Sequence, residues 1–531
     1  MLRKVIIKNY RAFKDFSLEF SPGVNIIVGD NATGKSTLLE AVNLALTARL
    51  RGNALATELS PYLFSRAAQD RYVQGLRAGE KPTPPEILIE VYFRDCDELA
   101  ELRGTNNSLR EDSPGARLRI FLDEDLRDSY LAYVSAPEQV ALVPSEYYTW
   151  EWLDFADNAI RHGRRLPDAS LIDASGIRLQ NGADQYMQRV ITEHLLPGER
   201  VELARSYRSL REMFAGFDTI SGINDRLAGG HDDVTSRSLS LSVDVSQRAA
   251  WERTLVPHLD DVPFQLTGSG EQVALKIMLT LNRKADDSHV ILIEEPENHL
   301  SFSSLNALMS KIARRCDGKQ VLVTTHSSYV LNKLGLGNLI LLTPSGGTRI
   351  TDLPADTTGY FKKLSGYDTL RLVLAKKVIL VEGPSDELVV QRAYLDLHGR
   401  LPIEDGVDVI NVRGLQAKRF LDIAVRLGKP AVVVNDNDGD PDAVRQRYSA
   451  YTAHPFIKVC IGEGEARTLE PQIVAANDLE VINRVLGKAY KTEDDLVAYM
   501  TGSNNKTDCA LAIFESTETI AMPGFIRDAV A

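Results

Sequence analysis

Acidic side chains follow two short apolar runs in the last third of the sequence. Glu382 ends the run Val378–Val381, and Asp386 stands after a tight Gly-Pro turn that opens a predicted helix. The run Ala431–Asn435 leads to three aspartates, Asp436, Asp438 and Asp440. Such runs predict buried strands, and active sites lie at the carboxyl ends of parallel strands. Hard cations prefer oxygen ligands, so the two motifs together predict a magnesium site. Either motif alone is equally compatible with an ordinary acidic loop.

A phosphate-binding loop stands near the beginning of the chain. Residues 29–36 read Gly-Asp-Asn-Ala-Thr-Gly-Lys-Ser, a complete GxxxxGKS pattern that follows a predicted strand and precedes a predicted helix. The glycines let backbone N–H groups turn toward phosphate. The Lys35 ammonium is expected to reach the β/γ-phosphates, and the Ser36 hydroxyl to ligate Mg²⁺. The predicted nucleotide-binding residues in this loop are Gly29, Asn31, Gly34, Lys35, Ser36 and Thr37.

Small residues at 267–270 precede another predicted helix. The segment Thr267–Gln272 reads Thr-Gly-Ser-Gly-Glu-Gln and opens an apolar helical pattern through Val273. Small residues at a helix N-terminus can bind an anion, so Ser269 and Gly270 are predicted to contact nucleotide. Taken alone, the segment is a weak signal, and a plain turn with a helix cap is the default interpretation. Its position shortly before the next motif is what favours the nucleotide-binding interpretation.

That next motif is an apolar run ending in two carboxylates. Val290–Ile293 leads to Glu294 and Glu295, the pattern of a Walker B strand. Glu294 is predicted to join the Mg²⁺ shell, and Glu295 to polarise the attacking water. His326 ends a further buried strand and is predicted to sense the γ-phosphate. A lone histidine at such a place is more often structural, and the ordered set of motifs is what favours the functional role.

The order of these motifs resembles the ABC-type ATPase head of SMC-like proteins. That resemblance implies that two heads enclose ATP and that the signature of one completes the site of the other. Two features depart from the usual pattern. The segment Thr267–Gln272 replaces Leu-Ser-Gly-Gly-Gln, and Glu294 stands where Asp is commoner. These departures weaken the expectation of fast hydrolysis but not that of nucleotide binding.

Apolar spacing also predicts how the chain is divided. Strands are expected at residues 5–10, 16–20, 25–28 and 86–93, and a hairpin at 117–122 with 130–134. Between 155 and 245 the spacing is helical, which suggests an inserted arm for dimerisation, although more of the core is an almost equal alternative. The predicted parts are residues 1–155 and 246–355 (the ATPase), 156–245 (the helical insertion), 356–370 (a linker) and 371–531 (a second α/β domain).

Composition sets limits on the class of protein. The 531 residues suffice for two or three domains, and 44% hydrophobic with 25% charged residues is ordinary for a soluble protein. The net charge of −12 gives no overall basic surface for nucleic acid, although a local groove or bound metal can reverse the sign. The four cysteines form no CxxC pair, and no apolar run is long enough to span a bilayer. We therefore expect a cytoplasmic protein without a membrane partner.

The acidic motifs at 382–386 and 436–440 resemble the TOPRIM fold of topoisomerases, primases and certain nucleases. An ABC-like head followed by TOPRIM resembles the OLD (overcoming lysogenization defect) nucleases, which include the nuclease subunit of the Gabija phage-defence system. The resemblance covers nearly the whole chain, including Glu294–Leu300, Thr468–Pro471 and Lys506–Leu511. It implies an α/β architecture, in which an ABC-type head with an inserted helical dimerisation region precedes a C-terminal TOPRIM domain.

The same resemblance implies site residues that the pattern alone would leave as solvated surface. Two divalent metals would be held by Glu382, Asp386, Asp436 and Asp438, with Asp440 or Glu470 as further ligands. Lys506 would neutralise charge at the scissile phosphate. The cofactors would be ATP and Mg²⁺, which Mn²⁺ or Ca²⁺ could replace in vitro. The partners would be DNA, a second copy of the chain in a homodimer or higher homo-oligomer, and a UvrD-like helicase.

The sequence therefore predicts an ATP-binding, metal-dependent DNA endonuclease. In the expected two-metal hydrolysis, one ion activates water and the other stabilises the leaving oxygen. One alternative is a nucleotide-sensing module with an inactive TOPRIM site, and another is a TOPRIM ribonuclease. Topoisomerase and primase are poor fits, because the sequence offers neither an evident cleavage tyrosine in a second domain nor a zinc ribbon.

Overall fold

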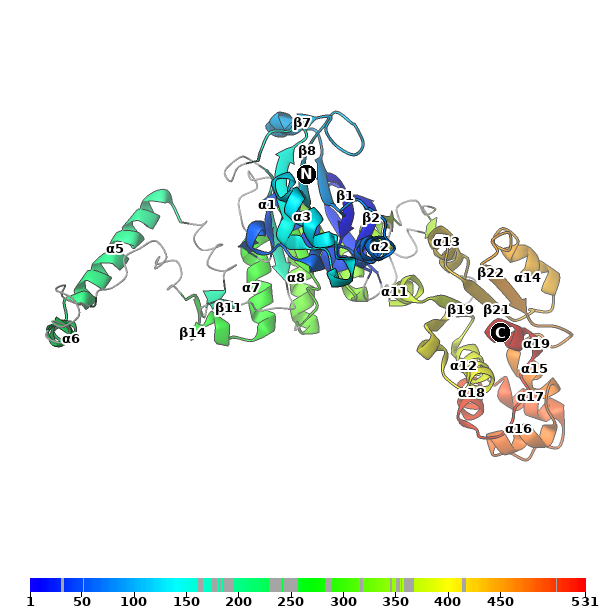
Figure 1. Cartoon of the computed structure of the whole chain (residues 1–531). Helices are drawn as coiled ribbons and strands as arrows, with labels where there is room; N and C mark the ends of the chain where they lie inside the picture. The colour runs from blue at the N-terminus through cyan, green and yellow to red at the C-terminus, as the bar shows by residue number, and fades with distance from the viewer. Residues whose placement is uncertain are drawn as a thin grey trace. The chain divides into compact units, whose positions relative to one another are not determined.

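The computed structural model describes residues 1–29, 33–50, 52–160, 166–173, 179–180, 183–184, 195–228, 241, 256–281, 289–298, 300–315, 319–343, 346–349, 354, 356–357, 367–412, 417–502 and 504–531 (Figure 1). They form two compact units. One consists of Met1–Arg11 with Ser36–Thr324, and the other of Ala12–Lys35 with Thr325–Ala531.

An antiparallel sheet forms much of the first unit. Strand β1 (Leu2–Tyr10) pairs with β6 (Ile87–Phe93), β6 pairs with β8 (Ser113–Leu122), and β8 pairs with β9 (Tyr148–Asp154). Apolar residues of β1 and β6 are fully buried, as expected for strands that pack on a core. The predicted strands near residues 5–10 and 86–93 are thereby confirmed.

The predicted hairpin of residues 117–122 with 130–134 is wrong. Residues 130–134 belong to helix α3 (Arg127–Val134), and β8 takes its partners from β6 and β9 instead. The segment 130–134 is too short for the spacing of its apolar residues to distinguish a helix from a strand. Tertiary contacts decide the outcome, because the buried Tyr130 hydroxyl hydrogen-bonds to that of Tyr72.

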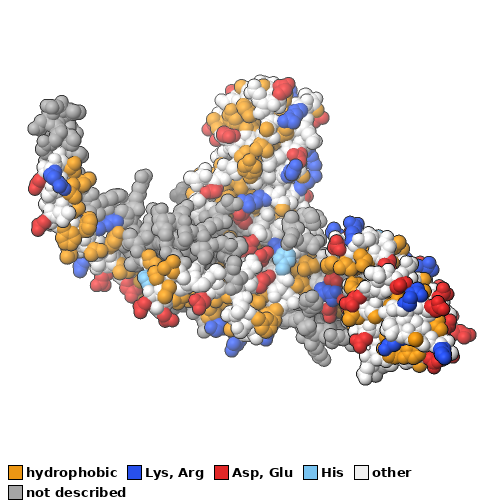
Figure 2. All heavy atoms as spheres, turned by 90° about the horizontal axis from the view of Figure 1, so that it is seen from below, with side chains coloured by type: hydrophobic (Ala, Val, Ile, Leu, Met, Phe, Trp, Pro, Cys, Tyr) orange, Lys and Arg blue, Asp and Glu red, His pale blue; other side chains and the backbone are white. Residues whose placement is uncertain are grey.

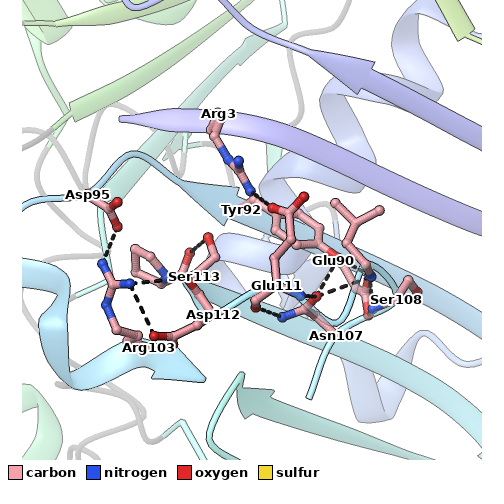
Figure 3. A network of polar contacts seen from close by, with 12 residues as sticks. Arg3, Glu90, Tyr92, Asp95, Arg103, Asn107, Ser108, Glu111, Asp112 and Ser113 are labelled. Atoms are coloured by element: carbon pink, nitrogen blue, oxygen red, sulfur yellow. Dashed lines mark hydrogen bonds and ion pairs between the residues drawn. The ribbon is translucent and has the colours of Figure 1, made fainter. Parts of the chain in front are cut away.

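Polar side chains anchor the loop that follows β7 (Arg103–Gly104) (Figure 3). Glu90 is buried, and its carboxylate accepts hydrogen bonds from the Ser108 N–H at 3.0 and 3.1 Å and from the Tyr92 hydroxyl at 2.8 Å. At the loop's far end, Arg3 pairs with Glu111 at 2.5 Å. A buried carboxylate with its oxygens satisfied in this way has a structural explanation and needs no ligand.

Three parallel strands carry the Walker B motif. Strand β15 (His289–Glu294) lies between β10 (Asp168–Asp173) and β16 (Gln320–Thr324), and both pairings are parallel. The continuous apolar sequence of β15 is typical of a strand covered on both faces. Strand β10 lies within residues 156–245, which the sequence analysis treats as helical. That prediction needs correction at β10, where the segment Ala169–Ile172 joins a buried parallel sheet.

The phosphate loop follows a strand of the second unit. Strand β3 (Val24–Val28) is parallel to β17 (Leu339–Thr343), which is antiparallel to β18 (Gly346–Arg349), and β18 in turn pairs with β2 (Phe13–Glu19). Helix α9 (Ser328–Leu334) contacts β3. The predicted strands at 16–20 and 25–28 are confirmed.

The C-terminal α/β region contains a separate four-stranded parallel sheet. Its order is β20 (Val407–Asn411), β19 (Lys377–Val381), β21 (Ala431–Asn435) and β22 (Ile457–Ile461). The core residues of β19 and β21 are almost completely buried. Around this core, helix α12 (Pro384–His398) contacts both α18 (Lys506–Glu515) and α19 (Gly524–Val530).

The other helices and short strands complete the two units. The helices among them are α1 (Lys35–Thr47), α2 (Arg66–Arg77), α5 (Pro197–Ala215), α6 (Asp218–Ala228), α7 (Ser269–Leu281), α8 (Phe302–Arg315), α11 (Tyr367–Leu374), α13 (Ala417–Leu427), α14 (Pro441–Tyr448), α15 (Leu469–Ala475), α16 (Leu479–Leu486) and α17 (Glu493–Met500). The short strands are β4 (Arg49–Leu50), β5 (Asn53–Ala54), β11 (Leu179–Gln180), β12 (Ala183–Asp184), β13 (His258–Leu259) and β14 (Val262–Pro263). Within the described residues, no helix combines the length and apolarity that crossing a membrane requires.

Candidate functional site

Two predicted metal ligands stand at the same edge of the C-terminal sheet. Strands β19 and β21 are parallel neighbours, so the residues that follow them, Glu382 and Asp436, emerge at adjacent carboxyl ends. Asp386 lies in the first turn of α12, where its carboxylate accepts a 2.9 Å hydrogen bond from the Gly383 N–H. The strand-turn-helix geometry predicted around Gly383 is confirmed.

These three carboxyl groups titrate far above their ordinary range. Burial raises the pKa of Asp436 to about 8, with further contributions from the negative charges of Asp386 and Glu382. Burial and the neighbouring Asp386 raise the pKa of Glu382 to about 7, and burial raises that of Asp386 to about 6. The ionised forms are therefore costly in the protein alone, and a cation among them would lower that cost.

The chemistry of this cluster fits a divalent cation. Ionised carboxylates supply only acceptor oxygens, and Asp436 Oδ1 is buried without a hydrogen-bond partner, as an oxygen reserved for another ligand would be. Among the described residues, however, no three acidic, histidine or cysteine side chains already surround one point as the ligands of a single ion would. The residue types and charges fit, and binding would require these side chains to converge further.

Asp438 and Asp440 occupy more exposed positions in the same loop. Asp438 has a left-handed backbone (φ 51°), and its Oδ2 lies 3.7 Å from the Arg447 guanidinium. A non-glycine residue in this conformation stores backbone strain, which is common at functional sites. Asp440 caps helix α14 by accepting a 3.0 Å hydrogen bond from the Ala443 N–H. Its capping role explains Asp440 without a metal, and its assignment as a ligand stays a prediction.

Glu470 and Lys506 form an ion pair. The Lys506 ammonium lies 3.1 Å from Glu470 Oε1 and 3.3 Å from Oε2, and the Thr468 hydroxyl donates to Oε2 at 3.0 Å. Glu470 is buried, and its charge acts on both Asp386 and Asp436. The sequence alone gave no reason to bring these two charges together. The structure thus joins both residues to the carboxylate cluster.

Two asparagines with clear structural roles escaped sequence analysis. The buried Asn435 donates through Nδ2 to Glu382 Oε1, and its Oδ1 accepts a 2.9 Å hydrogen bond from the Tyr448 hydroxyl. Asn437 is fully buried, donates to the carbonyls of Gly464 and Ala466 at 3.0 Å and thereby fixes the acidic loop. The sequence contained one signal for them: Asn435 and Asn437 are the two amides directly beside Asp436, in a segment that is otherwise mostly acidic.

The described part of the phosphate loop has the geometry that its glycines require. Gly34 has φ +97°, and a Cβ there would lie 2.6 Å from the Phe13 ring, while a Cβ on Gly29 would meet Thr33 Oγ1 at 2.6 Å. Lys35 is buried, and its ammonium donates to the Gly29 carbonyl at 2.9 Å. Asn31 lies outside the described residues, so its predicted role cannot be placed.

Helix N-termini carry the other predicted nucleotide-binding residues. Ser36 is exposed and Thr37 half-buried in the first turn of α1, and the N–H groups of such a turn can bind phosphate. Ser269 and Gly270 are half-buried at the start of α7, where Gln272 is buried and its Nε2 donates to the Thr267 carbonyl at 2.9 Å. A helix therefore begins at the predicted signature.

Both Walker B glutamates are half-buried at the end of β15. Glu294 is the last residue of the strand and pairs in register with Thr324. Glu295 has a left-handed backbone (φ 42°), its N–H donates to the Thr324 carbonyl at 3.0 Å, and its Oε2 accepts a 2.9 Å hydrogen bond from Asn298. Asn298 is thus a further residue that orients the predicted catalytic carboxylate. His326, in the other unit, follows β16 and is half-buried.

Two family models match the chain. One is described as "AAA domain, putative AbiEii toxin, Type IV TA system" and matches residues 24–332. The other is described as "Overcoming lysogenization defect protein-like, TOPRIM domain" and matches residues 373–438. The first match spans more than half of the chain and runs from the strand before the phosphate loop to beyond His326. The second includes both acidic strand ends.

Individual relatives share smaller or more distant similarity. The DNA replication and repair protein RecF of Lactococcus lactis is 31% identical over 127 residues, which cover 24% of this chain and 33% of RecF. An ATP/GTP phosphatase of Helicobacter pylori is 22% identical over 357 residues, and this match covers 63% of this chain and 87% of the phosphatase. The chain therefore spans about a third of the length of the Lactococcus lactis RecF that it matches.

Solved structures include the C-terminal region of the Xanthomonas campestris OLD protein, at 21% identity and a TM-score of 0.24, over 29% of this chain and 92% of that one. A structure of the recombination mediator RecF with ATP is 11% identical, with a TM-score of 0.34, over 66% of this chain and 99% of that one.

The two family matches define the class of protein: a mixed α/β chain in which an AAA-domain ATPase is followed by a C-terminal TOPRIM domain. The expected α/β class, with an ATPase followed by a C-terminal TOPRIM domain, is thereby confirmed. The AAA-domain model covers more than half of the chain, so the chain belongs to that family of ATPases. With the OLD-like TOPRIM match that follows it, the two models support an OLD-family ATPase–TOPRIM protein. An ATPase domain of this kind implies nucleotide binding.

Proposed function

We propose that this protein is an ATP-binding, divalent-metal-dependent DNA endonuclease. The observation that carries the proposal is the cluster of Glu382, Asp386 and Asp436 at one sheet edge, within the segment that matches the OLD-like TOPRIM model. Their raised pKa values and the unpartnered Asp436 Oδ1 favour a site built to receive positive charge.

The chain's own side chains have separate tasks in this proposal. Glu382, Asp386 and Asp436 would hold Mg²⁺ or Mn²⁺, with Asp438 and Glu470 as further ligands. The bound cations supply activation of water and stabilisation of the leaving oxygen in phosphodiester hydrolysis. Lys506 holds its positive charge beside Glu470 at 3.1 Å, from where it would neutralise a phosphate oxygen of the substrate. The half-exposed Lys506 and the buried Glu470 thus present opposite charges at the same site.

The ATPase would regulate cleavage, since phosphodiester hydrolysis needs no ATP of its own. Lys35 and Ser36 would bind the phosphates and Mg²⁺, with Glu294 as a further ligand of that ion. Ser269 and Gly270 would contact nucleotide bound to a second copy. Glu295 would polarise the attacking water, oriented by Asn298 at 2.9 Å. His326 would sense the γ-phosphate.

A homodimer is part of the same proposal. Helix α5 and the turn after it expose large apolar side chains: Val201, Leu210, Met213, Phe214 and Phe217 are each more than half exposed. Figure 2 displays hydrophobic side chains on the surface of this segment. Soluble proteins rarely leave such a group uncovered, so a second copy is proposed to pack on it. This assigns dimerisation to the described part of the helical insertion.

Two alternative functions differ from this proposal in the substrate or in the absence of nuclease activity. A TOPRIM ribonuclease would use the same carboxylates on RNA, and a nucleotide-sensing module would use none of them. A role in phage defence or DNA processing is proposed from the OLD family membership. The UvrD-like helicase partner has no support beyond the resemblance that suggested it.

The experiment that tests the proposal is cleavage of supercoiled plasmid by the purified full-length chain with Mn²⁺, with and without ATP. We expect cleavage that EDTA abolishes and that Asp436→Asn removes while the circular dichroism spectrum is unchanged. Parallel incubation with RNA separates the ribonuclease alternative. Metal-independent cleavage, or an Asp436→Asn variant that cuts at the wild-type rate, contradicts the proposal.

A further inference from the structure

A buried chain of hydrogen bonds leads from helix α14 to one of the carboxylates proposed to hold metal. The Tyr448 hydroxyl donates to Asn435 Oδ1 at 2.9 Å, and Asn435 Nδ2 donates to Glu382 Oε1. Tyr448 is 1% exposed and Asn435 3% exposed, so water cannot readily replace either bond. The three side chains come from α14, the end of β21 and the end of β19.

The three side chains determine which group donates and which accepts in each of these hydrogen bonds. A carboxylate only accepts hydrogen bonds, so Asn435 must turn its Nδ2 toward Glu382. That orientation directs Oδ1 toward Tyr448, and a buried carbonyl oxygen requires a donor. The Tyr448 hydroxyl is that donor. Without it, Asn435 Oδ1 would be buried without a donor, and the amide beside Glu382 would be held by one hydrogen bond instead of two.

Helix α14 acts on the acidic loop through a second, adjacent residue. Arg447 precedes Tyr448 and lies 3.7 Å from Asp438 Oδ2, while the N-terminal end of the helix is capped by Asp440. Both ends of this short helix are therefore joined to the segment that follows β21. Fixed outer partners of this kind orient ligands before the cation arrives.

We propose that Tyr448 is a positioning residue that acts through Asn435 to hold Glu382 in the orientation needed to bind a divalent cation. This inference rests on the proposed metal-dependent function and goes beyond it, since neither Tyr448 nor Asn435 is a ligand. The aromatic ring of Tyr448 belongs to the core, so the proposal concerns its hydroxyl alone.

The test is a double-mutant cycle on Mn²⁺ affinity, measured on the full-length protein by the electron paramagnetic resonance signal of free Mn²⁺. Asn435→Ala removes the direct partner of Glu382 and should raise the dissociation constant about tenfold. Tyr448→Phe removes one hydroxyl and should raise it about fivefold. Because the two residues act in series, Tyr448→Phe should add little in the Asn435→Ala background.

Tyr451→Phe is the matched control. The Tyr451 hydroxyl donates at 2.7 Å to Asp422, a carboxylate of helix α13 that is not a proposed ligand. Like Tyr448→Phe, this substitution removes a single hydroxyl that donates a hydrogen bond in the same unit. We expect its Mn²⁺ affinity to equal that of wild type. If Asn435→Ala does not fold, Asn435→Leu removes the same two polar groups with closer to the original volume, and the cycle is repeated with it.

The outcomes separate this inference from the function on which it rests. Wild-type protein that binds no Mn²⁺ overturns both. Wild-type protein that binds Mn²⁺ while Tyr448→Phe binds it equally well overturns the positioning role and leaves the nuclease proposal standing. Fully additive effects of Tyr448→Phe and Asn435→Ala overturn the series arrangement, because two independent residues would give that result.

Discussion

Lys506 and Glu470 lie within ion-pair distance although 36 positions separate them in the sequence, with the ammonium 3.1 Å from Oε1. The family resemblance implies different tasks for them, Lys506 at the phosphate and Glu470 at the metal. Their contact makes those tasks interdependent, because a cation bound by Glu470 would compete with the ammonium. Only 6% of the Glu470 side chain is exposed, against 40% of that of Lys506, so the glutamate depends more on the pair.

Replacing Lys506 with Met should therefore destabilise the metal-free protein. The substitution keeps an extended apolar side chain but leaves the buried Glu470 without its cation, at a cost of roughly 1–3 kcal/mol, discounted because the lysine is partly exposed. Added Mn²⁺ should raise the melting temperature of Lys506→Met more than that of wild type, because it substitutes for the lost charge. Differential scanning fluorimetry with EDTA or Mn²⁺ measures both effects.

The control for that comparison is Lys488→Met, which removes a lysine that lies 4.8 Å above the Tyr499 ring rather than beside a carboxylate of the cluster. It should show the wild-type response to Mn²⁺. Equal responses of Lys506→Met and Lys488→Met would mean that Glu470 does not contribute to cation binding.

The raised pKa of Asp436 predicts how stability depends on pH. Its folded value of about 8 lies above the ordinary 3.8, so the folded protein retains a proton that the unfolded chain releases. This contribution is complete at low pH and is lost as the pH rises toward 8. Metal-free wild type should thus lose stability between about pH 5 and pH 8, and Asp436→Asn should be more stable than wild type at pH 8, by about 1–3 kcal/mol.

Mn²⁺ should reverse that pH dependence. Metal binding needs ionised carboxylates, so the stabilisation by Mn²⁺ should increase from pH 5 to pH 8 in wild type and be small in Asp436→Asn at every pH. Thermal melts across this range, with and without metal, measure both slopes. A metal-free wild type whose stability is flat or rises across the window would show that Asp436 is not held protonated by its surroundings.

The sequence was sufficient to predict the strands that carry the acids and the tight turn between β19 and α12. Runs such as Ala431–Asn435 are uniformly apolar, and the polar residue after a buried strand must emerge at the sheet edge. It could not predict the pairing of Glu470 with Lys506, because a contact between distant segments has no local periodicity. Strand β10 was missed for a similar reason. It pairs with β15, which lies far along the chain, and local spacing does not reveal that pairing.

Substitutions at the nucleotide site should separate binding from hydrolysis. Lys35→Ala removes the cation predicted to meet the β/γ-phosphates and should abolish ATP binding. Glu295→Gln should retain binding and slow hydrolysis, and Asn298→Ala should slow it less, because it only releases the Glu295 carboxylate from its 2.9 Å hydrogen bond. Fluorescent ATP titration and phosphate release give the two readouts. Equal loss of ATP affinity in Lys35→Ala and Glu295→Gln would contradict these separate roles.

The apolar surface of α5 predicts an oligomeric state. Leu210 is 61% exposed and Phe214 53% exposed, and Phe214 forms an edge contact with the Phe217 ring at 5.8 Å. Burying one such side chain contributes about 1.5–3 kcal/mol, and a symmetric dimer would bury each of them twice. Wild type should therefore be at least a dimer at micromolar concentration, with or without ATP.

Charges on this surface should convert the dimer to a monomer without unfolding it. Leu210→Glu with Phe214→Glu introduces carboxylates that a packed interface would bury, whereas in the isolated chain both side chains are mostly exposed, so the fold of the subunit should be retained. Tyr62→Glu changes a side chain that is 76% exposed on a different element and should leave the dimer intact. Size-exclusion chromatography with light scattering, beside circular dichroism, measures both. A monomeric wild type, or a double variant that remains dimeric, would mean that α5 is not the contact between copies.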